Sequence, residues 1–292
     1  MKKIYGVICV VISSIGFGLM PVLAKLAYES GGNTYNVLFY RFLFALIVLW
    51  IYNLITGKSM KITKEQLKLI FIIGLVGYYT TSLALFMAYN YVPVGVATTI
   101  HFIYPAIVTA ASYFLYKEKI TPLKVFALVL SFIGVFMIIG ISSDVSLDIR
   151  GIVLSVVSAA VWAVYVLGVA NPLLEGINSS VLVFYISVIS CIGNGTAQAL
   201  TSKLNLLIPG KALIMVLLLT LLSTVIPMVT FGIGIQAIGP GSASILSTLE
   251  PVTSLIVGYL LLSEPITWQM ITGALFILAA VILLSVQKSD KG

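Results

Sequence analysis

Two ionisable side chains lie deep inside long apolar segments of the sequence, and they are the first candidates for chemistry. Glu250 stands directly before Pro251, and His101 is the only histidine of the chain. A carboxylate in such a place can accept a proton or pair with a cation, and an imidazole can donate or accept a hydrogen bond near neutral pH. Structural roles are equally open, because Glu250 could bind backbone amides freed by Pro251 and His101 could join two helices.

Polar and aromatic side chains occur in the same apolar segments and in neighbouring ones. Their rings and hydroxyls suit an aromatic, zwitterionic or cationic small molecule, since a cation gains about 0.5–2 kcal/mol over a ring face. Aromatic residues usually mark membrane interfaces, but Trp162 and Tyr104 stand near the middle of their segments. The candidate substrate-binding residues are His101, Glu250, Tyr104, Trp162, Tyr165, Tyr78, Tyr79, Asn90, Gln236 and Thr98.

Three further charged residues lie inside an apolar segment or in the loops between segments. Arg41 lies inside the second segment, and we expect its side chain to reach back to the membrane interface or to pair with Glu29. Binding of a substrate carboxylate is the alternative for Arg41. Glu118 and Glu264 occupy matching short loops, where we expect each to bind a helix N-terminus or to form an ion pair at a gate.

The chain offers little for catalysis or for metal binding. It has one histidine and 2 cysteines, Cys9 and Cys191, both within apolar runs, so neither a disulfide framework nor a zinc site is expected. We predict no catalytic residues, no metal and no cofactor, and a membrane enzyme is a remote alternative. Nucleic acid is not an expected partner despite a net charge of +7, because the lysines cluster in short loops between apolar segments.

The overall composition explains why these charges are so few. Of the 292 residues, 60% are hydrophobic and 9% are charged, and the mean hydropathy is +1.16. Soluble domains carry about 25% charged residues, so this chain could not cover a surface in water. The composition therefore predicts a polytopic membrane protein whose main partner is the lipid bilayer.

Charged loops and Gly-Pro breaks divide the chain into segments of about 20 apolar residues, the length that crosses a bilayer as a helix. The predicted spanning helices are 4–26, 34–55, 67–90, 94–115, 122–141, 151–171, 180–200, 212–237, 241–262 and 267–287. The first segment is too long for a signal peptide and lacks a cleavage site of small residues, so we expect it to be retained. The predicted fold class is an all-α membrane protein with ten transmembrane helices.

Basic residues in the short loops predict the orientation of these helices. If the N-terminus is cytoplasmic, most of the 16 basic residues fall on the cytoplasmic side, namely Lys2, Lys3, Lys58, Lys61, Lys64, Lys68, Lys117, Lys119, Lys124, Lys288 and Lys291. The prediction is a multi-pass protein of the cell membrane with both termini in the cytoplasm.

The two halves of the chain resemble each other. A shift of 146 residues pairs Gly95 with Gly241, Ala97 with Ala243, Pro105 with Pro251, Tyr113 with Tyr259 and Glu118 with Glu264. We therefore expect two five-helix repeats, residues 1–145 and 146–292. Because five is odd, the second repeat would enter the bilayer with opposite orientation. Such inverted repeats are common in secondary transporters, which bind substrate near the midplane between the halves.

The residues of this repeat resemble the EamA family of the drug/metabolite transporter superfamily. The similarity lies in Val94-Gly95-Val96-Ala97, Tyr104-Pro105 and Lys117-Glu118-Lys119, in the second copy Gly241-Ser242-Ala243 and Glu250-Pro251, and in Trp162-Ala163-Val164-Tyr165. Phe17-Gly18 departs from the family, which has Trp-Gly there. The resemblance implies a ten-helix transporter of small metabolites, commonly an exporter of amino acids or related compounds.

Residues and resemblance together predict a secondary active transporter that works by alternating access. The expected substrate is an amino acid or a related zwitterion or amine, moved outward across the cytoplasmic membrane, with protons as a candidate coupling ion. An importer or a facilitative uniporter of a small cationic or aromatic metabolite is the alternative. A channel is disfavoured, because nothing in the sequence resembles a carbonyl-lined filter or a charged ring.

The repeat also predicts which helices surround the substrate. We expect the first, third and fourth helices and their counterparts, the sixth, eighth and ninth, to line a central cavity. The fifth and tenth helices carry few polar residues, and we expect them at the periphery. The protein is expected to be a monomer or a homodimer.

Overall fold

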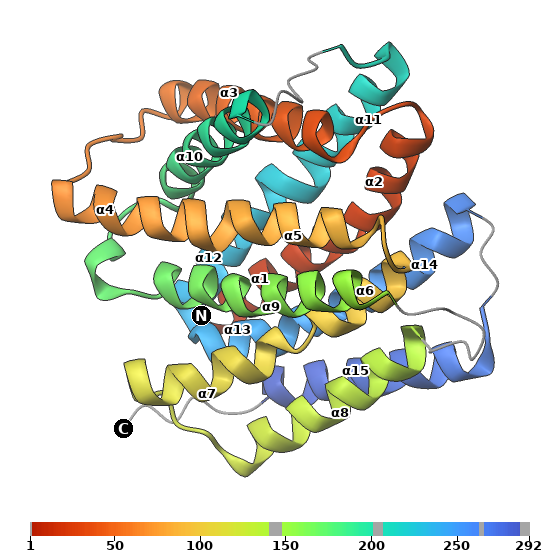
Figure 1. Ribbon diagram of the computed structural model, residues 1–292. Coiled ribbons are helices and arrows are strands. Elements are labelled where there is room, and N and C mark those ends of the chain that lie inside the picture. Colours follow the sequence, from red (N-terminus) through yellow and green to blue (C-terminus); the bar gives the residue numbers. More distant parts are fainter. Residues whose placement is uncertain (1, 140–147, 201–206, 263–265, 287–292) are drawn as a thin grey trace.

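The chain forms a bundle of helices joined by short connections (Figure 1). The computed structural model describes residues 2–139, 148–200, 207–262 and 266–286, and these ranges contain no strand. The predicted boundary between the repeats lies outside the described residues, as do Glu264, Lys288 and Lys291. The all-helical prediction is confirmed over the described ranges.

Several of the predicted spans are built from two or three helical pieces. In the first half the pieces are α1 (Lys2–Gly18), α2 (Met20–Glu29), α3 (Thr34–Ile55), α4 (Lys64–Ile72), the π-helical segment η1 (Ile73–Tyr79), α5 (Thr80–Ala88), α6 (Val94–His101), α7 (Tyr104–Tyr116) and α8 (Pro122–Ile139). The second half contains α9 (Ile149–Val169), the 3₁₀ turn η2 (Pro172–Leu174), α10 (Ser179–Leu200), α11 (Gly210–Thr220), the π-helical segment η3 (Leu221–Val225), α12 (Ile226–Ile238), α13 (Pro240–Leu246), the 3₁₀ turn η4 (Ser247–Leu249), α14 (Glu250–Leu262) and α15 (Trp268–Val286).

Nine helical stretches within the described residues are long and apolar enough to cross a membrane. α8 is also apolar but shorter along its described part, so the tenth span stays a prediction. Large apolar side chains cover the outside of the bundle, and Phe114, Leu260 and Trp268 are each more than 60% exposed. Water would not tolerate so much exposed apolar surface, whereas lipid would.

Local sequence signals explain where several helices begin and end. Asn33 accepts hydrogen bonds from the first turn of α3 and forms a capping box with Asn36, and Thr63 does the same with Gln66 at α4. Such reciprocal bonds satisfy backbone amides that have no partner within the helix. Gly239, with φ of 86°, ends α12 and allows the chain to turn directly into α13.

The packing of the helices fits a two-fold relation between the halves. α1 packs against α12, and α9, its counterpart in the second half, packs against α5. Two other pairs join matching helices, namely α3 with α10 and α8 with α15, and α7 packs against α13, which are pieces of the matching fourth and ninth spans. A two-fold axis between the repeats produces both patterns, because it maps each helix onto its counterpart in the other half. The inversion of the repeats relative to the membrane stays a prediction.

The closest of these pairings joins α8 and α15. A Cβ atom added at Gly134 would lie 2.6 Å from the carbonyl oxygen of Gly273, and one added at Gly273 would lie 2.5 Å from that of Gly134. Both residues must therefore lack a side chain for the helices to approach. This contact holds the two helices together at one edge of the bundle, in agreement with their predicted peripheral position.

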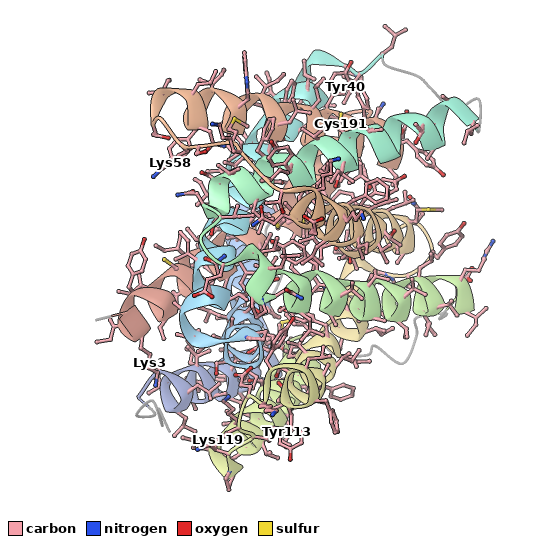
Figure 2. The ribbon with its side chains drawn as sticks, turned by 90° about the vertical axis from the view of Figure 1, so that its left-hand side faces the viewer. Lys3, Tyr40, Lys58, Tyr113, Lys119 and Cys191 are labelled. Atoms are coloured by element: carbon pink, nitrogen blue, oxygen red, sulfur yellow. The ribbon has the colours of Figure 1, made fainter. Side chains whose placement is uncertain are left out.

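Segments predicted on the same membrane side lie together. In Figure 1 the start of α4 and the end of α7 are on the left, whereas the start of α6 and the end of α14 are on the right. Lys3, Lys58 and Lys119, all predicted to be cytoplasmic, lie at the edge of the bundle (Figure 2). The arrangement agrees with the predicted order of crossings, and the assignment of one side to the cytoplasm stays a prediction.

Candidate functional site

Most of the helices around the centre of the bundle are interrupted near their middle. The first span bends between Gly18 and Met20, the third contains η1, the fourth breaks at Phe102 and Ile103, and the ninth contains η4. π-Helical segments and helix breaks free backbone groups and often occur at functional sites. A shift of 146 residues places η1 over η3 and the break at Phe102 over η4.

A pocket lies among these interruptions, and we call it the central cavity; its empty volume of about 400 Å³ includes the solvent at its open side. Its lining consists of Phe17, Met20, Arg41, Tyr78, Thr81, Ser82, Leu85, Phe86, His101, Trp162 and Glu250. One acidic, one basic and one imidazole side chain thus share an otherwise apolar and aromatic space. Small-molecule sites typically combine a few polar groups with such walls.

Glu250 is the first residue of α14 and lines the central cavity. Within the described part of the chain its carboxylate has no hydrogen-bond partner, so the alternative in which it binds backbone amides freed by Pro251 is not seen there. The neighbouring packing is tight, because Ser254 donates a hydrogen bond of 2.7 Å to the carbonyl oxygen of Gly18. The carboxyl group thus lines the central cavity without a hydrogen-bond partner among the described residues.

His101 ends α6, and its ring is oriented by a serine of α9. Its Nδ1 lies 2.9 Å from Ser158 Oγ, and the Ser158 hydroxyl donates to the carbonyl oxygen of Ser155 at 2.7 Å. Because that serine proton is already used, Ser158 accepts from His101, which places the hydrogen of the neutral imidazole on Nδ1. Nε2 is then a hydrogen-bond acceptor, and no described protein group binds it.

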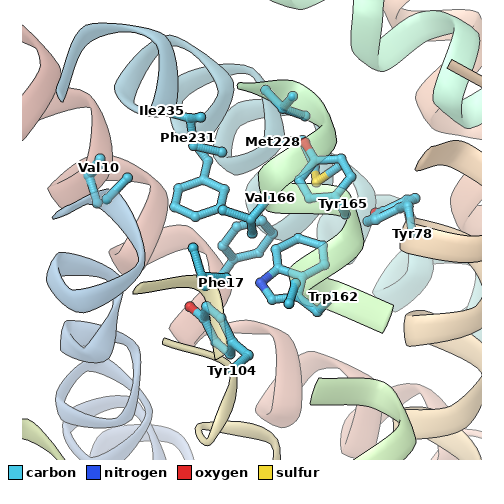
Figure 3. Packing of buried hydrophobic residues seen from close by; sticks show 14 of the residues in the cluster. Val10, Phe17, Tyr78, Tyr104, Trp162, Tyr165, Val166, Met228, Phe231 and Ile235 are labelled. Carbon is cyan, nitrogen blue, oxygen red and sulfur yellow. The ribbon is translucent and has the colours of Figure 1, made fainter. Parts of the chain in front are cut away.

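Trp162 forms an aromatic wall beside the cavity (Figure 3). Its ring stacks on Tyr165 at a centroid distance of 4.5 Å and on Phe231 at 6.1 Å, while Phe17 meets it edge to face at 6.0 Å. Tyr104 also meets Trp162 edge to face, at 6.3 Å. Such contacts fix the position of the indole ring, which offers an ordered surface to a ligand.

Arg41 is the basic residue of the central cavity. Its Nε donates to Thr224 Oγ1 at 2.7 Å and its Nη2 donates to Tyr78 OH at 3.1 Å. The residue is 1% exposed, so the prediction that it reaches the interface or pairs with Glu29 is wrong. Thr224 and Tyr78 provide acceptors deeper in the bundle, and these contacts between distant segments are not visible in the sequence.

A second space, which we call the wide cavity, adjoins the central cavity and has an empty volume of about 1520 Å³. Met20 and Glu250 line the central cavity, and the residues that follow them, Pro21 and Pro251, line the wide one. The other residues of the wide cavity are Val22, Lys25, Tyr28, Glu29, Tyr89, Pro93, Val94, Thr98, Ile138, Ser254, Leu255 and Met270. These segments belong to the side that topology predicts to be external.

The opposite end of the ninth span is held by Glu118. The amides of Gly241 and Ser242 donate to its carboxylate at 2.9 and 3.3 Å, the Ser242 hydroxyl donates at 3.2 Å, and Lys124 Nζ lies 2.7 Å away. We call this set the Glu118 contact. It confirms the expected interaction with a helix N-terminus, and it joins the first half of the chain to the second.

Electrostatics favour the ionised form of Glu118. Burial by itself raises the pKa of this carboxyl, but the hydrogen bond and charge of Lys124 and the amide of Gly241 outweigh it and hold the pKa below its usual range. A helix N-terminus stabilises negative charge in the same way. The Glu118 carboxylate is therefore ionised at neutral pH.

The predicted site residues separate into three groups. His101, Glu250, Trp162 and Tyr78 line the central cavity, and Thr98 lines the wide cavity.

The second group lies behind this lining. Tyr165 stacks against Trp162, Tyr104 is hydrogen-bonded to Ser247, and Tyr79 packs against Phe42.

Asn90 and Gln236 form the third group, because both are exposed near helix ends and neither belongs to the lining of the two cavities. The two residues match at a shift of 146 residues and thus stand at equivalent helix ends. Polarity in an apolar segment alone does not say which face of the helix a residue occupies.

The lining also includes residues that the sequence analysis did not select. Thr81, Ser82, Leu85 and Phe86 of α5 follow the predicted Tyr78 at helical spacing. That spacing marks one face of a helix, and it is the signal by which the sequence could have identified these residues. α11 and α12 contribute no lining residue to the central cavity, contrary to the expectation for the eighth helix, although Phe231 of α12 supports Trp162. α8 and α15 each contribute one residue to the wide cavity.

Within the described ranges, no three His, Cys, Asp or Glu side chains lie close enough together to hold a metal ion. The arrangement instead suits reversible binding of a small polar molecule, with a carboxylate, a guanidinium and an imidazole nitrogen around an aromatic wall.

A family model, described as the EamA-like transporter family, matches residues 4–140 and again residues 149–286. The chain belongs to this family. The double match confirms that each half carries one copy of the EamA repeat, and the predicted resemblance is correct. The described helices and this membership identify a multi-pass membrane transporter.

Curated relatives of this EamA protein have similar names. An uncharacterized transporter of Archaeoglobus fulgidus is 27% identical over 83% of each chain, and one of Clostridium kluyveri is 22% identical over 97% of this chain and 93% of its own. The uncharacterized inner membrane transporter YicL of Salmonella typhimurium is 26% identical, covering 96% and 95%. A crystal structure with 14% identity covers 97% of this chain and 96% of its own, with a TM-score of 0.80, and thus shares the fold.

Proposed function

We propose that the protein is a secondary transporter that carries an amino acid, or a related zwitterion or amine, out of the cell by alternating access. The observation that carries this proposal is the central cavity, in which Glu250, Arg41 and His101 surround an aromatic wall between the two repeats. A buried site with few polar groups at the junction of two repeats is the arrangement that secondary transporters use.

The two ends of the bundle support alternating access. The wide cavity adjoins the central cavity at one end, while the Glu118 contact ties the halves together at the other. A site that is approached from one side and closed on the other corresponds to one of the two states of such a carrier. With the predicted topology, this state is open to the outside.

We also propose that transport is outward and is coupled to protons. In an exporter the substrate leaves from the outward-open state, and a proton could then bind Glu250 in its place and return inward. The direction of net flux follows from the gradients, so import or facilitated diffusion by the same site would use the same residues. The transporter names of the relatives give no support to the alternative of a membrane enzyme.

A ligand screen tests the proposed site. Purified protein is heated with single amino acids, amines, nucleosides and vitamins, and a ligand that binds the folded state raises the melting temperature. We expect amino acids or amines to do so in the wild-type protein and to lose most of the effect in Glu250→Gln. Glu65→Gln is the matched control, because Glu65 is exposed in the first turn of α4.

Two outcomes would contradict the proposal. Stabilisation only by nucleosides or vitamins would overturn the substrate class, and equal stabilisation of wild type and Glu250→Gln by a transported ligand would remove Glu250 from the site.

A further inference from the structure

Arg41 carries a buried donor group that no part of the described protein uses. The Nε and Nη2 atoms are bound to Thr224 and Tyr78, but Nη1 is buried without a hydrogen-bond partner. A guanidinium keeps its charge in proteins, and a buried charge with unused donors is costly to the folded state. Such a group is what a site leaves for an anionic ligand atom.

The two residues that hold Arg41 come from matching places in the two halves. Tyr78 lies in η1 and Thr224 lies in η3, and their positions differ by 146 residues. The guanidinium is therefore fixed at two points by the π-helical segments of both repeats. The ring of Phe86 lies over it, with Arg41 Cζ 5.4 Å from the ring centroid. A group oriented in this way presents Nη1 in a defined direction, which favours selective binding.

Charge balance points to the missing partner. Glu250 is the acidic residue of the central cavity lining, and the described residues show no ion pair between it and Arg41. The cavity thus contains a guanidinium and a carboxyl group that do not neutralise each other. A ligand with a carboxylate and an ammonium group would form an ion pair with each of these two residues.

We propose that Arg41 Nη1 binds the substrate carboxylate while Glu250 binds its ammonium group, so that the transported class is amino-acid zwitterions. His101 Nε2 can accept a second hydrogen bond from the same ammonium group. The substrate side chain then lies against the apolar part of the lining, which includes Phe17, Leu85 and Trp162. This inference rests on the proposed function and narrows its substrate class.

The test uses sets of three ligands that share one side chain. Phenylalanine, phenethylamine and 3-phenylpropionate form one set, and leucine, isoamylamine and 4-methylvalerate form another. The proposal predicts that the purified wild-type protein binds at least one amino acid about 10- to 100-fold more tightly than its amine and its acid, since each loses a charge-assisted hydrogen bond. Wild-type protein that binds the amine as tightly as the amino acid overturns it.

Two variants then show which residue binds the carboxylate of the substrate and which binds its ammonium group. Arg41→Gln should weaken binding of the amino acid by about tenfold or more and leave the amine unchanged, because the amine has no carboxylate to lose. Glu250→Gln should weaken the amino acid and leave 3-phenylpropionate unchanged. Arg41→Lys keeps the charge but not the forked donors, and is expected to fall between wild type and Arg41→Gln.

Arg150→Gln is the matched control, because Arg150 is the other arginine of the chain and pairs with exposed Asp148 at 2.6 Å. It should bind all three ligands like wild type. Equal weakening of amino acid and amine in folded Arg41→Gln would show a structural role and overturn the proposal. If Arg41→Gln does not fold, the comparison of amino acid, amine and acid binding to the wild-type protein decides. Saturable transport of an amine without preference for the amino acid would refute the zwitterion site alone, whereas absence of any carrier activity would refute the proposed function.

Discussion

The carboxyl group of Glu250 and the imidazole of His101 line the same cavity. The carboxyl group has no described hydrogen-bond partner, whereas the imidazole is anchored by Ser158. The difference suggests different tasks, with Glu250 free to exchange a proton for the substrate and His101 placed to bind.

Glu250→Gln should abolish the pH dependence of transport. The amide keeps the shape of the side chain and some of its hydrogen bonds but cannot take up a proton, so the fold should be retained. The measurement is flux in proteoliposomes at several pH values, with the melting temperature as a check of folding. Wild-type pH dependence in the variant would favour a structural role, and a wild-type protein without any pH dependence would indicate a uniporter.

His101→Ala should weaken substrate binding more than coupling. Loss of one hydrogen bond corresponds to about 2- to 12-fold in affinity, and the pH profile of flux should keep its shape. Ser158→Ala is the comparison, because it removes the Nδ1 partner that orients the ring but keeps the imidazole itself. If His101→Ala lost its pH dependence and bound substrate normally, the two roles would have to be exchanged.

At the scale of elements, the sequence predicted the spans well because long apolar segments are a strong signal. It did not predict the π-helical segments, since nothing in the residues of Ile73–Tyr79 distinguishes them from an ordinary helix. Those segments turn Tyr78 and Thr224 toward Arg41, and for that reason the role of Arg41 was missed. The breaks before Pro105 and Pro251 have a visible signal in the sequence, because proline removes a backbone donor.

Glu118→Gln should loosen the end of the bundle that this residue holds. The variant loses the charge that attracts Lys124 and the N-terminus of α13. A cysteine introduced by Ser244→Cys, buried behind that end, should react about tenfold faster with a membrane-impermeant thiol reagent, after Cys9 and Cys191 are replaced by serine. Glu65→Gln provides the control, and an unchanged reaction rate would show that Glu118 does not close this end.

The lowered pKa of Glu118 fixes the sign of the pH effect on this contact. A group with a depressed pKa contributes its stability above its usual range and loses it as the pH falls through the lowered pKa. The ratio of the labelling rates with and without Glu118→Gln, taken at each pH so that the titration of the thiol cancels, should therefore stay constant from pH 8 to pH 5 and fall towards one only at more acidic pH.

At the scale of the whole molecule, the internal repeat predicted more than any single motif. It predicted two copies of one repeat, which the family match confirms. It could not place Asn90 and Gln236, because a repeat aligns positions along helices without saying which face meets the cavity. The orientation in the membrane depends on loop lysines, several of which lie outside the described residues.

Both termini are predicted to be cytoplasmic, because most of the basic residues then lie inside. A reporter that is active only outside the cytoplasm, fused to the C-terminus, should be inactive, and a cytoplasmic reporter at the same place should be active. The reverse pattern would exchange the two sides and place the wide cavity on the cytoplasmic face.

The central claim is that this protein carries a substrate through the central cavity. Counterflow tests it most directly: proteoliposomes are loaded with an unlabelled amino acid that stabilises the protein, and uptake of the labelled amino acid is followed. The account predicts saturable uptake that the internal amino acid accelerates, and loss of this acceleration in Glu250→Gln but not in Glu65→Gln. Flux that rises linearly with concentration and ignores the internal substrate would contradict a carrier and indicate a channel.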